Sequence, residues 1–193
     1  MSMNQTHDLQ DLHQLLGKHD ACHEARSWAK PFTTSAEAWA ACQRPDWMLW
    51  ALKKVDWQDV NKLRLFACNC IFSTPLTEDG TTWDLLTDPR SRQAVETAKR
   101  FVAGLASDKE LELASSAAWA VAKGASSDAW AAWAAAWTAA KQAAAAATWA
   151  AAWIANAVLR EKDQAAWERA QAAQAQLLRD LIGNPFSNTH PRQ

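Results

Sequence analysis

The sequence has no tyrosine, and among its 193 residues there are only five glycines and six prolines. It also lacks the short motifs that most often mark chemistry: Gly-x-Ser-x-Gly, a glycine-rich phosphate loop and His-Glu-x-x-His. Paired acids such as Asp108 with Glu110, or Glu161 with Asp163, stand at expected helix starts, where capping accounts for them. These absences favour a protein that is not an enzyme, and they predict neither a catalytic residue nor a cofactor.

Charge of either sign is not in excess, since 20 Lys and Arg side chains stand against 21 Asp and Glu side chains. A chain this close to neutral is not drawn to nucleic-acid polymers or to anionic membranes. Four cysteines are few for a disulfide scaffold, and the first residues lack the basic end and apolar stretch of a signal peptide. We therefore expect a cytoplasmic protein with reduced thiols.

The cysteines also lack the spacing of a metal site. Zinc sites favour Cys-x-x-Cys pairs, whereas Cys68 and Cys70 point to different sides of one helix. We expect no metal, and we interpret all four cysteines, Cys22 and Cys42 included, as small buried apolar side chains. One uncharged run, residues 142–159, has the length of a membrane span, but its alanine content favours a buried helix.

Alanine and tryptophan dominate what is present. Between Ala117 and Ala175, 29 of the 59 residues are alanine and seven are tryptophan. Alanine is the best helix former because it loses no rotamer freedom in a helix. We predict an all-α protein, a compact multi-helix array whose Ala/Trp-rich C-terminal helices pack closely, with Trp filling the gaps between alanine faces.

Local signals divide one helical domain, 1–193, into successive parts. These are a loose N-terminus (1–7), Trp/Cys-containing helices (8–72), a loop (73–88), a helix pair (89–124), Ala/Trp-rich helices (125–183) and a tail (184–193). From residue 125 onwards, neither glycine nor proline occurs before Gly183. A change in the helix face that carries the Trp residues predicts a break near 139–142, and a run of charged residues predicts another near 160–163.

Caps and stops predict the individual helices. The expected helices are 8–16 stopped by Gly17, 22–29 capped by Asp20, 36–43 with a Thr34–Glu37 capping box, 46–54 after Pro45, a helix from Asp56 or Asp59 to Cys70, a turn at 83–86, a helix from Pro89 to Gly104, and 108–123 with a Ser107–Glu110 box.

Aromatic and charged side chains gather near the N-terminus and form the candidate binding site. The candidates are Trp28, Trp39, Arg44, Asp46, Trp47, Trp50, Arg64, Arg90 and Arg92. On one interpretation the Trp side chains are core and Arg44 with Asp46 is a structural ion pair. On the other, Trp stacks on a flat ligand in a pocket while Arg binds its phosphate or carboxylate. The Asp88–Glu96 cluster has the same two interpretations.

Residues Ala21 to Lys54 resemble the opening of a family of bacterial and phage immunity proteins. In that family Ala-Cys-x-Glu-Ala-x-x-Trp leads to Glu-Ala-Trp-x-x-Cys-x-Arg-x-Asp-Trp-Met-Leu-Trp, and this chain has the two motifs from Ala21 and from Glu37. The stretches Arg64–Cys70, Asp88–Leu111 and Leu177–Phe186 are similar to other alanine-rich proteins of this kind. Pro45 departs from the small residue that is usual there. The resemblance implies neutralisation of a partner in conflict between bacteria, or between phage and host, without catalytic residues.

Three hypotheses follow. In the first, the protein neutralises a toxin or defence effector by protein binding, which needs an exposed apolar patch. The alternative is a sponge that sequesters a nucleotide-like immune signalling molecule in a Trp/Arg pocket, and the third is an enzyme acting on such a signal. Between Ala125 and Leu159 only Asp128 and Lys141 are charged, which suggests either central burial or a homo-oligomer face.

Overall fold

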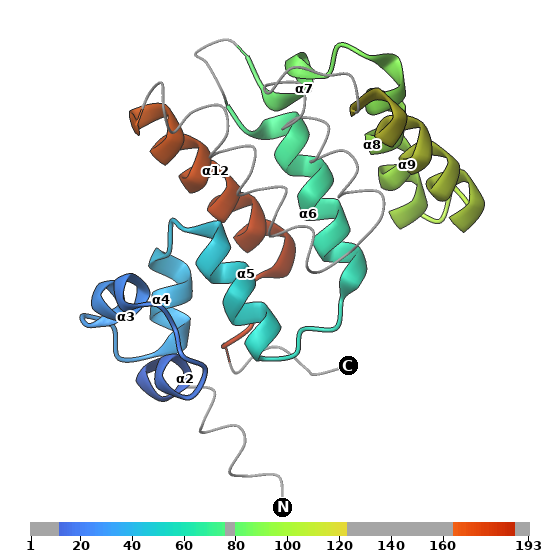
Figure 1. Ribbon diagram of the computed structural model, residues 1–193. Coiled ribbons are helices and arrows are strands. Elements are labelled where there is room, and N and C mark those ends of the chain that lie inside the picture. The colour runs from blue at the N-terminus through green and yellow to red at the C-terminus, as the bar shows by residue number, and fades with distance from the viewer. Residues whose placement is uncertain (1–11, 76–79, 123–163, 188–193) are drawn as a thin grey trace, which may run out of the picture.

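The computed structural model describes residues 12–75, 80–122 and 164–187, and their regular structure is helical (Figure 1). The one strand-like pairing within these ranges is an isolated bridge between Pro75 and Thr81. The all-α prediction is therefore confirmed. The expected break near 139–142, the uncharged run 142–159 and the suggested oligomer face lie outside the described residues.

Short helices come first and longer ones follow. They are α2 (Leu12–Lys18), α3 (His23–Ala29), α4 (Ser35–Ala41), α5 (Pro45–Lys54), α6 (Val60–Ser73), α7 (Thr82–Leu85), α8 (Pro89–Val102), α9 (Asp108–Ala122) and α12 (Gln164–Ile182). The break expected near 160–163 lies outside the described residues, and α7 lies one residue earlier than predicted.

Capping side chains set several of these starts, as the sequence predicts. The Thr34 hydroxyl accepts from the Glu37 amide at 3.2 Å, and the Glu37 carboxylate accepts in return from the Thr34 amide. The Asp59 carboxylate accepts from the Lys62 amide at 3.0 Å to begin α6. These bonds satisfy amides that a helix start leaves unpaired.

Three local predictions are wrong. Gly17 does not stop α2, which continues to Lys18, and the left-handed residue that turns the chain is Asp20, with φ of +49°. Asp20 therefore does not cap α3; Cys22 does, through a 3.4 Å bond from the Ala25 amide to its sulfur. Asp56 likewise takes a left-handed turn, with φ of +55°, instead of capping α6.

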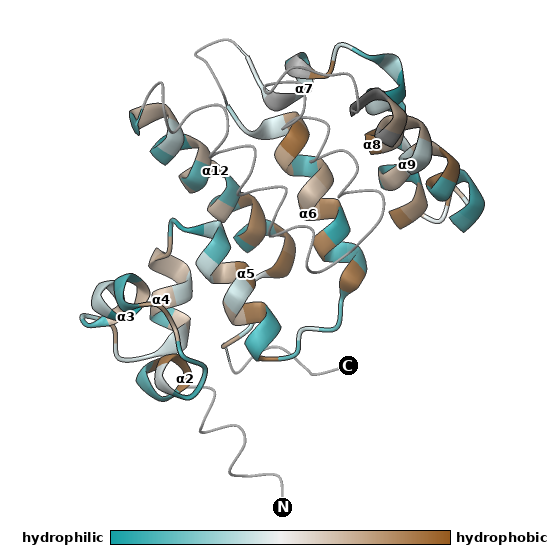
Figure 2. Ribbon diagram, viewed as in Figure 1, coloured by the Kyte–Doolittle hydropathy of each residue, from teal (hydrophilic) through white to brown (hydrophobic). Residues whose placement is uncertain are grey.

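Helix α6 is central to the larger part of the molecule. It contacts α12 on one side and α8 on the other, while α7 packs against it and α9 packs on α8 (Figure 1). Buried Gln174 of α12 donates to the Thr74 hydroxyl at 3.1 Å, just after α6. Helices α5 and α6 carry both brown and teal segments in Figure 2, as expected of helices with one buried and one exposed face.

Two groups of buried apolar residues make up the core. The larger one joins α4, α5, α6, α8, α9 and α12 and contains Phe66, Ile71 and Leu178, each fully buried. The smaller one joins α2, α3 and α4 through Leu12, Leu16 and small alanines. Trp28 packs against both groups. None of the described helices combines the length and apolar character that crossing a bilayer requires.

Candidate functional site

A pocket of about 530 Å³ lies where α2, α3, α4 and α5 meet, with Phe186 from the segment after α12 in its wall. Six of the nine residues predicted from the sequence line it: Trp28, Trp39, Arg44, Asp46, Trp47 and Trp50. We call it the Arg44 pocket. Its volume lies within the range of small-molecule sites.

Alanines provide the space in this pocket. Ala25 and Ala29 are four residues apart on one side of α3, Ala21 lies just before that helix, and all three line the pocket. Ala38 of α4 and Ala51 of α5 also line it. Because a methyl group fills little volume, the gap between the helices is left for the larger rings to border.

Tryptophan rings form much of the wall. The Trp28 ring lies against Phe32 and Trp47, with centroid distances of 4.8 Å and 5.6 Å. Trp28, Trp47 and Trp50 are half-buried, so part of each ring is accessible, whereas Trp39 is 4% exposed. Trp presents the strongest aromatic face for stacking and for binding cations.

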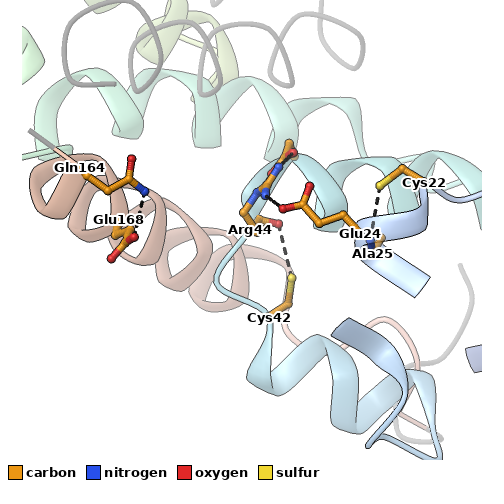
Figure 3. A network of polar contacts seen from close by, with 8 residues as sticks. Cys22, Glu24, Ala25, Cys42, Arg44, Gln164 and Glu168 are labelled. Atoms are coloured by element: carbon orange, nitrogen blue, oxygen red, sulfur yellow. Dashed lines mark hydrogen bonds and ion pairs between the residues drawn. The ribbon is translucent and has the colours of Figure 1, made fainter. Parts of the chain in front are cut away.

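Arg44 is already paired inside the pocket. Its Nε and Nη2 donate to the two oxygens of Asp46 at 2.9 Å and 2.7 Å, in a bidentate pair. Its Nη1 lies 3.6 Å from the Glu24 carboxylate of α3, and Figure 3 shows this contact between the helices. The guanidinium also stands 4.5 Å from the centre of the Trp47 ring. The hydrogen bond to Asp46 is the main cause that raises the pKa of Arg44 above its ordinary value.

The segment after α12 fastens one side of the pocket. The Trp39 indole donates to the Gly183 carbonyl at 2.8 Å, and its ring meets Phe186 at 5.9 Å. Asn184 donates to the Ala36 carbonyl at 3.0 Å, and Arg179 donates to the Cys42 carbonyl at 2.6 Å. Residues more than a hundred positions apart thus build one wall.

The thiols differ in exposure. Cys42, Cys68 and Cys70 are buried as predicted, but Cys22 is exposed, because it caps α3 at the pocket edge. Burial raises the pKa of Cys42 to about 11 and that of Cys68 to about 12, and it raises the pKa of Cys70 as well. Cys42 borders the pocket as an un-ionised thiol that donates to the Arg44 carbonyl at 3.5 Å.

Three predicted residues do not line the pocket. Arg64 lies on α6, 4.7 Å from the Phe101 ring centre, and Arg90 pairs with Asp88 at the start of α8. The Arg92 Nε donates to the Leu86 carbonyl at 2.7 Å, and its guanidinium stands 5.2 Å from the Trp83 ring centre. Arg64, Arg90 and Arg92 therefore lie outside the Arg44 pocket, and the two interpretations given for them stay predictions.

Arg92 belongs to a second aromatic group, which we call the Trp83 cluster: Phe72, Trp83, Arg92 and Lys99. Phe72 and Trp83 stack with centroids 4.4 Å apart, and the Lys99 ammonium lies 4.4 Å from the Phe72 ring centre. The rings of this cluster are thus in contact with each other and with its own cations.

Sequence reasoning missed several pocket residues. Asp20, Ser35 and Phe186 all line the pocket. Ser35 is 1% exposed, and its hydroxyl has no hydrogen-bond partner in the described part of the chain. The four-residue alanine interval of α3 was a usable signal for the space, but nothing local indicates that Phe186 returns to this wall.

Among residues 12–75, 80–122 and 164–187, no group of three His, Cys, Asp or Glu side chains is placed to hold a metal ion. Comparisons of the chain with protein-family models, curated proteins and solved structures found no match. The resemblance of residues 21–54 to immunity proteins therefore stays a prediction.

Proposed function

We propose that the protein acts by binding, without chemistry, and sequesters a small organic molecule in the Arg44 pocket. The observation that carries this proposal is a pocket of about 530 Å³ bordered by four tryptophans and by alanines that leave its volume open. Mostly apolar pockets with a few polar groups are the usual form of small-molecule sites. The resemblance to immunity proteins supplies the proposed setting, conflict between bacteria or between phage and host.

The surface gives less support to neutralisation of a toxin or effector by protein binding. Within the described residues the large apolar side chains that stand exposed are Val60, Leu105 and Leu113. Val60 begins α6, Leu105 lies in the turn before α9, and Leu113 lies on α9. Single exposed apolar residues are ordinary on proteins and do not make a patch of several hundred Å².

Filling the pocket tests the proposal. Ala51→Phe places a ring in the pocket from α5, and Ala40→Phe places the same ring on an exposed position of α4. Calorimetry with quinoline, a flat uncharged probe, should detect binding to the wild type and to Ala40→Phe. Because the new ring takes the ligand's place, Ala51→Phe should bind at least about tenfold more weakly.

Native mass spectrometry of the purified protein gives an independent readout of any molecule already bound. A wild type that binds no quinoline and carries no small-molecule adduct contradicts the proposal. So does an Ala51→Phe variant that remains folded by circular dichroism and binds quinoline as the wild type does.

A further inference from the structure

The charges that line the Arg44 pocket bear on which ligand it accepts. Among the described residues, four side chains of Asp, Glu and Arg type line it: the carboxylates of Asp20, Glu24 and Asp46, and the guanidinium of Arg44. The ionised lining is therefore net negative. Two further cations lie nearby, but neither side chain lines the pocket. The Lys54 ammonium lies 5.7 Å from the Trp50 ring centre, and Arg179 donates a hydrogen bond to the Cys42 carbonyl.

Arg44 is poorly placed to attract an anion. Both oxygens of Asp46 accept from it, Glu24 lies at 3.6 Å, and the Trp47 ring covers the guanidinium at 4.5 Å. A phosphate or carboxylate would have to displace a bidentate charge-assisted pair, which is among the stronger hydrogen-bonded arrangements in proteins. The freed Asp46 would then stand next to the incoming anion.

Two carboxylates remain less engaged. Glu24 is 73% exposed, and among the described residues its one ion pair is the 3.6 Å contact to Arg44; Asp20 is exposed at the turn between α2 and α3. Both lie at the pocket with the half-buried rings of Trp28, Trp47 and Trp50. A cation is attracted both by a carboxylate and by the face of a tryptophan ring.

A polar group is also available in the buried wall. Ser35 lines the pocket at 1% exposure, and its hydroxyl has no partner among the described groups. A hydroxyl both donates and accepts, so it can bond a polar atom on a flat ligand without adding charge.

We propose that the Arg44 pocket selects an organic cation, a flat apolar body that carries an ammonium or ring-nitrogen charge. This inference rests on the proposed function and names its ligand class. The body stacks among the tryptophans, and the charge faces Glu24 and Asp20. The pocket thus discriminates against nucleotide-like phosphates, the ligand class of the alternative hypothesis from the sequence.

A matched series of probes tests this selection by calorimetry at low ionic strength. Quinoline is uncharged, 1-methylquinolinium is a cation and quinoline-4-carboxylate is an anion on the same ring system. The cation should bind about two- to fivefold more tightly than quinoline because of the carboxylates and ring faces. The anion should bind more weakly than quinoline, and added salt should reduce the differences in affinity among the three probes.

Neutral variants locate the source of the preference. Glu24→Gln should weaken binding of 1-methylquinolinium about twofold or more and leave quinoline unchanged. Asp20→Asn should add to this loss, and Asn tolerates the left-handed backbone at that position. Glu112→Gln, at an exposed position of α9, removes the same charge away from the pocket and should change neither probe.

The outcomes separate the two proposals. The proposed charge selection is overturned if the anion binds as tightly as the cation, or if Glu24→Gln keeps the wild-type preference for 1-methylquinolinium over quinoline. In either case, binding of quinoline still supports the pocket as a small-molecule site. Failure of all three probes to bind overturns both.

Discussion

The Arg44 pocket and the Trp83 cluster are built from the same residue types, but their aromatic rings pack differently. In each, an arginine guanidinium stands over a tryptophan ring, at 4.5 Å in the pocket and 5.2 Å in the cluster. In the cluster, Phe72 stacks on Trp83 at 4.4 Å and occupies the ring face that a ligand would need. In the pocket, alanines of α3, α4 and α5 line the wall together with the rings, and the enclosed volume is about 530 Å³.

The comparison indicates that a binding site depends on the small residues as much as on the aromatic ones. Trp and Arg supply affinity for a ligand, but an aromatic partner within the protein uses the same affinity for packing. The alanines that make this chain look featureless are what keep the pocket open.

The largest expected difference between the two regions is in stability. Trp39→Ala removes a ring that is 4% exposed, leaves the Gly183 carbonyl without its donor and should cost about 3–5 kcal/mol of unfolding free energy. Trp83→Ala removes a half-buried ring and should cost about half as much, because less buried apolar surface area is lost. Denaturant unfolding measures both costs.

Hydrogen exchange measures the local effect of the same two variants, Trp39→Ala and Trp83→Ala. Trp39→Ala should speed exchange of amides in 183–187, since the ring and its N–H fasten that segment, whereas Trp83→Ala should not. Equal costs and unaltered exchange in both variants would show that Trp39 does not fasten the pocket wall.

The sequence predicted the local starts of helices better than it predicted the site. The Thr34–Glu37 and Ser107–Glu110 boxes and the Asp88–Pro89 start are confirmed, since a cap depends on residues three or four apart. Gly17 failed as a stop because the turn used a left-handed Asp20 instead.

The site was predicted in part because its aromatic motif is local, from Trp28 to Trp50. Of the four candidate arginines only Arg44 lines the pocket, because the packing of neighbouring helices, and not residue type, decides which space an arginine faces. The return of Phe186 to the wall depends on packing of α12 on α5, which no local pattern encodes.

Replacing each arginine by methionine sharpens the comparison through binding. Arg44→Met keeps an apolar stem but loses the bidentate bonds to Asp46, and Arg92→Met loses its bond to the Leu86 carbonyl. Each should cost about 1.5–3 kcal/mol, the range for hydrogen bonds to charged groups. The two stabilities should therefore fall by similar amounts.

Their effects on the probes should differ. Arg44→Met makes the pocket lining more negative and should strengthen binding of 1-methylquinolinium about twofold or more, while Arg92→Met should not change it. Weaker binding of the cation, or lost binding of quinoline-4-carboxylate from a wild type that binds it well, would instead identify Arg44 as an anion anchor.

The smallest expected effect concerns two buried hydroxyls. Ser35 in the pocket wall and Ser115 on α9 are 1% and 2% exposed, and neither hydroxyl has a hydrogen-bond partner among the described residues. Burying a hydroxyl without a partner is unfavourable, so Ser35→Ala and Ser115→Ala should each leave the unfolding free energy unchanged or slightly raised.

Binding should distinguish the two serines. Only Ser35→Ala should also weaken the binding of a probe that forms a hydrogen bond with this hydroxyl, because of the two serines Ser35 is the one that lines the pocket. A clear loss of stability in Ser35→Ala without ligand would show that its hydroxyl is bonded in the empty pocket, and the polar contact inferred for the ligand would then have to come from another wall residue.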